Sequence, residues 1–255
     1  MRIVHCGGQG TAEWFAARIG MLTSSRIADA IGKRKRDPDT PLQARVDLCL
    51  ELAVERVTQK PSQHFVSDWM TRGAELEPLA RAAYELRTDQ EVTAIDFVLH
   101  PEIEWSGCSP DGACGDELIE IKVPKPETHA SYLLADCVPK QYLDQMCWQL
   151  ACCPECKANT FISWCPDFPE GLDLFICRLP RDPERIAAME AEAVKFLQEV
   201  GNTVLRLRGG LEGFMEASVA NHKSGAFVDS GRQESQGEVV QPLVPRAQIP
   251  EMGDV

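Results

Sequence analysis

Ser109-Pro110-Asp111-Gly112, followed on the next predicted strand by Glu120-Ile121-Lys122, is the stretch of sequence that decides the fold. Alternate residues of a β-strand point to the same face, so Glu120 and Lys122 project together. The Pro-Asp-Gly turn brings Asp111 beside them. Two carboxylates and an ammonium on one face suit the hydrolysis of a phosphate ester. The carboxylates would hold Mg²⁺ through oxygen, and the lysine would orient or help deprotonate the attacking water.

The same pattern has an ordinary structural explanation. An acidic residue two positions before a lysine is common on the solvated face of a strand, and Pro-Asp-Gly is a common hairpin turn. The neighbouring residues favour a site instead, because they indicate a central and largely buried strand. They are Leu118, Ile119, Ile121 and Val123. Burying a charged pair among them costs several kcal/mol unless a partner or a metal compensates.

Five motifs occur in a fixed order between about residue 10 and about residue 207. They are Gly10-Thr11-Ala12-Glu13-Trp14 with Arg18, Gly20 and Thr23-Ser24-Ser25; Arg72-Gly73-Ala74-Glu75-Leu76-Glu77; Cys108-Ser109-Pro110-Asp111-Gly112; Leu118-Ile119-Glu120-Ile121-Lys122-Val123-Pro124; and Tyr142-Leu143-Asp144-Gln145. Together they resemble the phage lambda exonuclease and YqaJ-like recombinase nucleases, within the PD-(D/E)xK superfamily. The resemblance implies an α/β (α+β) fold with a restriction-endonuclease-like core, in which helices flank a central mixed β-sheet.

The resemblance also implies roles for the residues of the central motifs. Asp111, Glu120 and the backbone carbonyl of Ile121 would bind Mg²⁺, for which Mn²⁺ could substitute. Lys122 would activate the water or stabilise charge on the phosphate. Glu77 would be a third, helix-borne acid that acts on the metal directly or through a water molecule.

Two further assignments concern residues on predicted helices, and the role of Gln145 is implied by the resemblance alone. Glu75 is the alternative to Glu77, because residues two apart lie about 200° apart around a helix and only one of them can face the site. Gln145 would touch the scissile region or position Lys122. Many relatives carry a second glutamine two residues later, where this chain has Cys147.

By resemblance, Arg18, Ser25 and Ser109 would form a pocket for the 5′-phosphate of the degraded strand. Arginine offers phosphate a two-pronged hydrogen-bonding fork, and serine hydroxyls add short hydrogen bonds. Ser25 could instead cap a helix, and Arg18 could be a surface cation. We expect Trp14 in the core rather than stacked on a base.

The activity implied by the resemblance is that of a Mg²⁺-dependent 5′→3′ exonuclease, which digests double-stranded DNA ends to 3′ overhangs. The implied partners are two further copies in a homotrimeric ring and a single-strand annealing protein, in a bacterial host cell that carries the gene in a phage or prophage. One alternative is an iron–sulfur nuclease that acts on single strands. Another is a non-catalytic DNA-end-binding module with a nuclease fold.

Composition narrows the class of protein. The net charge is −13 over 255 residues, which argues against a general nucleic-acid coat protein. Lys33-Arg34-Lys35-Arg36 is a dense basic run, either a phosphate-contacting loop or a solvated turn. We find no apolar run long enough to span a membrane and no secretory signal in residues 1–10, so we expect a cytoplasmic protein.

The chain contains 11 cysteines, an odd number scattered among apolar residues. This usage is typical of reduced thiols that act as small hydrophobic side chains. A cluster of four could bind zinc or an iron–sulfur cluster, although free thiols are the favoured interpretation. Its members are Cys152, Cys153, Cys156 and Cys165.

Hydrophobic spacing and end signals predict helices over residues 13–19, 23–31, 41–58, 68–87, 128–135, 140–151 and 182–208. β-branched and apolar runs predict strands over residues 91–99, 103–108, 118–123, 160–165 and 172–177. We expect Leu42, Val46, Leu50 and Val54 to form the apolar face of the 41–58 helix. Residues 1–208 would be a single nuclease domain, and residues 209–255 a flexible tail, because aromatic residues nearly vanish there.

Overall fold

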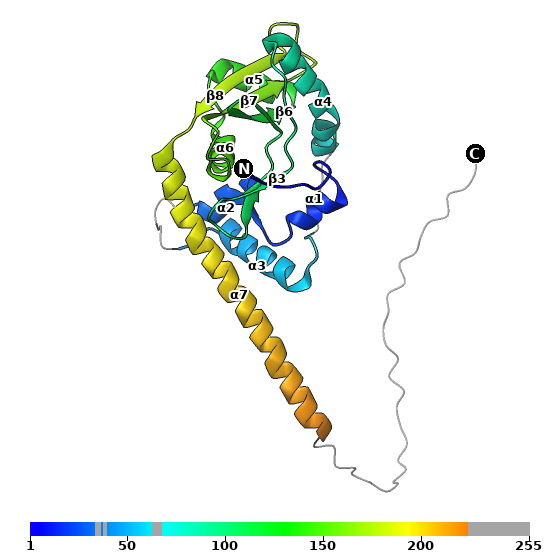
Figure 1. Ribbon diagram of the computed structural model, residues 1–255, viewed down its shortest axis with the longest axis vertical. Helices are drawn as coiled ribbons and strands as arrows, with labels where there is room; N and C mark the ends of the chain where they lie inside the picture. The colour runs from blue at the N-terminus through cyan, green and yellow to red at the C-terminus, as the bar shows by residue number, and fades with distance from the viewer. Residues whose placement is uncertain (34–36, 38–39, 63–67, 224–255) are drawn as a thin grey trace, which may run out of the picture. The chain divides into compact units, whose positions relative to one another are not determined.

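A computed structural model describes residues 1–33, 37, 40–62 and 68–223 of the chain. Met1–Gly213 form one compact unit, shown in Figure 1 with its helices gathered around two sheets. The α/β class is confirmed, with one refinement. The strands form two mixed four-stranded sheets instead of a single central sheet.

The first sheet has the order β1-β3-β4-β2 and is built from short strands. Its members are β1 (Arg2–Val4), β2 (Leu22–Thr23), β3 (Phe97–Leu99) and β4 (Ser106–Cys108). β2 runs parallel to β4, while β1 and β4 run antiparallel to β3. The sequence predicted β3 and β4 as longer strands and did not predict β1 or β2, because two or three residues carry no readable alternation.

The second sheet holds the central motif. Its order is β5-β6-β7-β8, formed by β5 (Gly112–Cys114), β6 (Glu117–Lys122), β7 (Ala158–Trp164) and β8 (Leu174–Pro180). β5 and β6 form an antiparallel hairpin, and β6 pairs in parallel with β7. A parallel pair needs a long crossover, which α5 (Pro126–Ala135) and α6 (Lys140–Cys152) supply.

Alternation along β6 divides its residues between two helices. Ile119 and Ile121 pack in one hydrophobic cluster with Ala80 and Tyr84 of α4 (Asp68–Thr88). Leu118, on the other face, packs with Trp148 of α6. Glu120 and Lys122 share the α6 face, as their spacing predicts. The sheet is therefore covered by α4 on one side and by α6 on the other.

The N-terminal helices are α1 (Ala12–Ala17), the 3₁₀ turn η1 (Ser24–Arg26), α2 (Ile27–Ile31) and α3 (Gln43–Thr58). The α3 helix is confirmed, but its predicted buried face is wrong. Val46, Leu50 and Val54 are 37–51% exposed, whereas Leu48, Leu52 and Ala53 are in the core.

Two buried charged residues explain this rotation of α3. Glu55 accepts a hydrogen bond from the Gly20 amide, and Arg56 donates one to the Gly20 carbonyl. Gly20 has a φ of 68°, and a Cβ there would collide with the Arg56 side chain. Hydrophobic spacing cannot predict which face of α3 is buried when the hydrogen bonds of Glu55 and Arg56 to Gly20 determine it.

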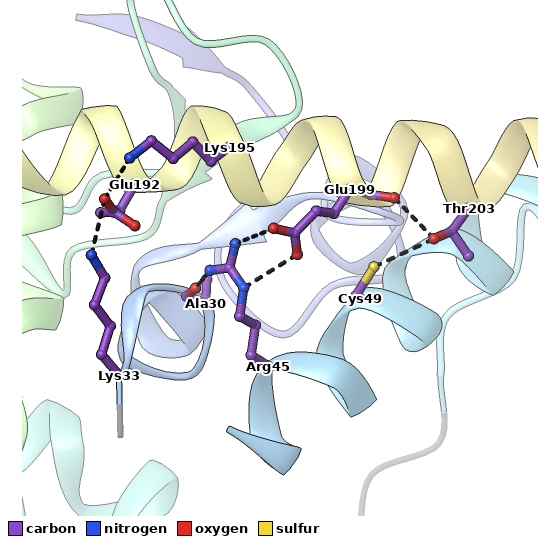
Figure 2. A network of polar contacts seen from close by, with 8 residues as sticks. All are labelled: Ala30, Lys33, Arg45, Cys49, Glu192, Lys195, Glu199 and Thr203. Carbon is purple, nitrogen blue, oxygen red and sulfur yellow. Dashed lines mark hydrogen bonds and ion pairs between the residues drawn. The ribbon is translucent and has the colours of Figure 1, made fainter. Parts of the chain in front are cut away.

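The last helix, α7 (Pro183–Lys223), begins where Asp182 caps the Arg185 amide, as predicted. It continues 15 residues beyond the predicted end at residue 208, so residues 209–223 are helical. Figure 2 shows the polar contacts that join its first half to Lys33, just after α2, and to Arg45 and Cys49 of α3. Residues 224–255, which form most of the predicted tail, lie outside the described residues. So do Arg34, Lys35 and Arg36 of the basic run. Within the described chain, no helix is both long and apolar enough to cross a membrane.

Candidate active site

Asp111 is held against the backbone of β6. Its amide donates to the Ile119 carbonyl over 3.0 Å, and its Oδ2 accepts from the Ile121 amide over 2.6 Å. Arg81 of α4 donates to the Asp111 carbonyl over 2.6 Å. The Pro-Asp-Gly turn therefore places this carboxylate beside the charged end of β6, as the sequence predicts.

Glu120 is almost completely buried and receives a donor on each carboxylate oxygen. Gln145 donates to Oε1 and Gln149 to Oε2, each over 2.6 Å. Lys122 forms an ion pair with Oε1. Gln149 in turn accepts a 2.6 Å hydrogen bond from Asn159 of β7. The carboxylate is fixed in orientation by two helical glutamines and a lysine from its own strand.

Burial and like charge act on the acids of this cluster. Burial raises the pKa of Asp111 well above its usual range, and the Glu120 carboxylate raises it further. Burial would lower the pKa of Lys122, but the Glu120 and Asp111 carboxylates outweigh it, so the net shift is upward. The cluster thus places two buried carboxyl groups around one ammonium.

This donor set fits a hard divalent cation. The two carboxylates are buried, and the Glu120 charge adds to the cost of ionising Asp111, which a cation bound between them would relieve. Among the described residues, no three His, Cys, Asp or Glu side chains converge as a metal-binding group. Mg²⁺ does not need such a cage, because it keeps several waters and takes one or two carboxylates together with substrate phosphate.

The same observation bears on the cysteine cluster. Cys152, Cys153, Cys156 and Cys165 are free thiols, and all four are buried. They are described residues, and they form no group of three or more metal ligands. For this cluster the sequence favoured free thiols; Cys152, Cys153 and Cys156 lie in the main core cluster, where they pack as small hydrophobic side chains.

Glu77 lines a cavity of about 460 Å³ that also contacts Lys122 and Tyr142. Its pKa is raised mainly by burial, against the opposing charges of Lys122 and Arg81. Glu75 is exposed, so Glu77 is the glutamate of the pair that faces the site. It belongs to no three-carboxylate cluster, and a role through water stays a prediction.

Arg18 and Ser109 meet in a second polar cluster. The Ser109 hydroxyl accepts hydrogen bonds from Arg18 and from the Trp14 indole, each over 3.0 Å. The Arg18 guanidinium lies 3.9 Å from the Trp14 ring centroid. Burial lowers the pKa of Arg18 to about 10, so it remains charged at neutral pH. Trp14 is half-buried and supports this arginine, so its predicted core position is wrong.

Ser25 is not joined to that cluster in the same way. Ser25 is an exposed residue of η1. Its hydroxyl lies 3.3 Å from Thr23 Oγ1. Within the described part of the chain, no hydrogen bond links it to Arg18 or Ser109. The structure therefore brings together two of the three residues predicted for the 5′-phosphate pocket.

Three residues of the site were not predicted: Gln149, Asn159 and Arg81. Gln149 lies one helical turn after Gln145, and this i, i+4 spacing on α6 was the available signal. Arg81 follows Glu77 by the same spacing. Asn159 carries no such signal, because its role depends on the pairing of β6 with β7. Cys147, at the position of the missing second glutamine, is buried in the core, and Gln149 supplies the second amide.

Comparison with known proteins gives consistent matches. Residues 13–157 match the YqaJ-like viral recombinase domain. An alkaline exonuclease from Laribacter hongkongensis is 35% identical with a TM-score of 0.73, over 80% of this chain and 100% of that one. Its complex with dAMP matches at 36% identity with the same TM-score and coverage. A phage-related exonuclease from Haemophilus somnus 129PT shares the fold, at 13% identity and a TM-score of 0.56 over 75% of this chain and 96% of that one. No curated protein sequence matches the chain.

Proposed function

Because this chain belongs to the YqaJ-like viral recombinase family, we propose that it is a Mg²⁺-dependent 5′→3′ exonuclease that converts double-stranded DNA ends to 3′ overhangs. The observation that carries the proposal is the cluster of Asp111, Glu120 and Lys122 at one end of β6. A decayed nuclease fold would not be expected to keep all three side chains together with two glutamine donors on the carboxylate. The cluster therefore argues for catalysis over simple DNA-end binding.

The chain's own residues have separable roles in this reaction. Mg²⁺, or Mn²⁺ in its place, would be held by Asp111, Glu120 and the Ile121 carbonyl, and it supplies Lewis acidity toward phosphoryl oxygens. Lys122, which forms an ion pair with Glu120, would activate the attacking water or stabilise charge on the phosphate. Gln145 and Gln149 keep the Glu120 carboxylate in place.

In this proposal, the cluster of Arg18 and Ser109 determines the 5′→3′ direction of digestion, because it binds the terminal 5′-phosphate. Because the Ser109 oxygen accepts two N–H groups, its own proton is left to donate to a phosphate. A terminal 5′-phosphate carries a charge close to −2 and would pair with Arg18. Ser25 joins this pocket by family resemblance.

The polarity assignment predicts a preference for phosphorylated ends. Charge-assisted hydrogen bonds are worth roughly 1.5–3 kcal/mol each, so initial rates on 5′-phosphate ends should exceed those on 5′-hydroxyl ends by more than about tenfold. Arg18→Ala should remove most of this preference by slowing attack on phosphorylated ends. Equal wild-type rates on the two ends would refute the pocket and leave the catalytic assignment standing.

Two partners belong to the same proposal. We expect a homotrimeric ring and a single-strand annealing protein, both by family resemblance. Light scattering should then give a mass three times the 28.3 kDa of the chain. A monomeric protein that still digests DNA would overturn the ring and not the chemistry.

The direct test uses linear duplex DNA labelled at either the 5′ or the 3′ end, with and without Mg²⁺. Release of 5′-labelled mononucleotides at the outset, with the 3′ label retained in long strands, is the expected result. Release of the 3′ label first would reverse the polarity. Binding to ends without any metal-dependent cleavage would favour the non-catalytic module.

A further inference from the structure

The cavity beside Lys122 has a second end that the catalytic cluster does not use. Its walls run from Lys122 and Tyr142 to Trp69, on the first turn of α4, and Lys125, after β6. Trp69 is 45% exposed, although tryptophan is highly buried on average. An open aromatic ring is therefore continuous with the pocket in which the phosphodiester would react.

Positive charge surrounds this ring. The Lys125 ammonium lies 4.7 Å from the ring centroid of Trp69, and the Arg72 guanidinium lies 5.3 Å from it. Arg72 also lies 3.5 Å from Asp167, an exposed carboxylate that balances it only in part. In a chain with a net charge of −13, two cations beside an exposed indole at the catalytic pocket are a local reversal of charge.

An exposed aromatic face flanked by cations matches the chemistry of a nucleotide. Bases of any sequence stack on aromatic side chains, while lysine and arginine bind the adjoining phosphates. We propose that Trp69 is a stacking platform for a base next to the scissile phosphate in the degraded strand, with Lys125 and Arg72 binding that strand's backbone. This inference rests on the proposed exonuclease function and adds a base-binding site to it.

The test combines a protein change with a substrate change. Duplex DNA carries an abasic residue at the first, second or third nucleotide of the 5′-ended strand. Binding to wild type and Trp69→Ala is measured by fluorescence anisotropy, with Ca²⁺ replacing Mg²⁺ to limit cleavage. Trp69→Ala should weaken binding of intact duplex about tenfold. At one of the three abasic positions, the affinity of the wild type should also fall about tenfold. The affinity of Trp69→Ala should fall little further at that position, because the variant has already lost the indole on which the base stacks.

Two further variants sharpen the result. Trp69→Phe keeps an aromatic face and should retain most of the affinity. Trp105→Ala removes a tryptophan of nearly equal exposure, 44%, which lies under the Arg56 guanidinium at 4.3 Å and lines no part of the pocket. It should leave the abasic response unchanged.

Several outcomes would overturn the platform. One is that, at every abasic position, the affinity losses caused by Trp69→Ala and by the abasic residue multiply as independent effects. Another is a change in oligomeric mass in Trp69→Ala, which would place the indole in a subunit interface. If wild type still digests intact duplex with Mg²⁺, either result removes the platform and leaves the nuclease function intact. A wild type that neither binds nor cuts duplex DNA would remove both.

Discussion

Two polar networks of this domain use the same kinds of side chain but differ in burial. In the catalytic cluster, Asp111 and Glu120 are buried and share one ammonium, that of Lys122. At the junction of α7 with α2 and α3, Glu192 pairs with Lys33 and Lys195, and Glu199 pairs with Arg45 (Figure 2). Glu120 is 1% exposed, whereas the Glu199 side chain is 51% exposed.

The two networks shift proton affinity in opposite directions. Burial and the Glu120 charge raise the pKa of Asp111, whereas hydrogen bonds from Lys195 and Lys33 lower the pKa of Glu192. The junction pairs are balanced and screened by water, so each contributes little to stability. The carboxylates of the proposed catalytic site are costly to bury, and a bound cation and phosphate would offset that cost.

The largest test of this contrast is Asp111→Asn. Activity on duplex ends should fall on the order of 10³-fold or more, because a metal ligand is lost. The free energy of unfolding without metal should stay equal or rise, since the change removes a buried charge. Chemical denaturation and end-digestion assays measure the two quantities.

Glu192→Gln is the matched control for that experiment. It removes a paired, partly exposed carboxylate and should lower stability slightly while leaving digestion unchanged. If Asp111→Asn digests DNA almost normally, or loses several kcal/mol of stability, the contrast between the two networks fails.

The second prediction concerns His100, which joins the first sheet to α7. Its Nδ1 accepts hydrogen bonds from the Glu102 and Ile103 amides, and its Nε2 lies 3.2 Å from Glu190. Burial lowers its pKa to about 4 from an ordinary value of 6.5. Between these values the unfolded chain binds the proton and the folded chain does not, so stability falls as pH drops from 6.5 toward 4, by up to about 3 kcal/mol.

Urea unfolding at several pH values, compared with His100→Asn, isolates this contribution. Carboxylates elsewhere titrate in both proteins and cancel in the difference. The wild type should lose its advantage over the variant as the pH falls through this range. A difference that does not depend on pH would show that His100 is not held neutral by the fold.

The third prediction separates Gln149 from the residues that touch substrate. Gln149→Leu leaves one oxygen of Glu120 without its Gln149 donor and leaves Asn159 with only its longer hydrogen bond, to the Met146 carbonyl. Loss of such a supporting hydrogen bond costs about 10–100-fold in metal affinity or activity. A Mg²⁺ titration of digestion rate should therefore shift to higher concentration. Gln141→Leu, on the same helix but bonded to Tyr132, should leave the titration unchanged; an equal shift in both variants would point to damage to α6.

The clustering of the proposed catalytic carboxylates could be predicted because the information for it is local. A turn and a strand period of two suffice to place Asp111, Glu120 and Lys122 together. Gln145 was found by motif, whereas its contact with Glu120 required the packing of α6 on β6. Asn159 could not be found, because it reaches the site from β7, whose pairing with β6 only the folded chain defines.

The two errors in the helices have different origins. On α3, the spacing of Val46, Leu50 and Val54 predicts a buried face, but the buried pair of Glu55 and Arg56 turns the helix the other way. On α7, the apolar pattern weakens before the helix ends, and local composition did not reveal its continuation to Lys223. Polar contacts between distant segments override local hydrophobic spacing in the first case.

The smallest effect should come from the most complete pair at the α7 junction. Arg45 donates to both oxygens of Glu199, over 2.7 Å and 3.2 Å, and bonds the Ala30 carbonyl. Its guanidinium also lies 5.0 Å from the Phe196 ring centroid.

Because Glu199 is exposed, a double-mutant cycle of Arg45→Ala and Glu199→Ala should give a coupling free energy of about 0.2–1 kcal/mol. The coupling should shrink in 1 M salt, where the Debye length is only about 3 Å. DNA digestion should not change in any member of the cycle. A coupling of several kcal/mol that salt does not reduce would mean that water is excluded from the junction as it is from the proposed catalytic cluster. Burial would then no longer distinguish the two networks.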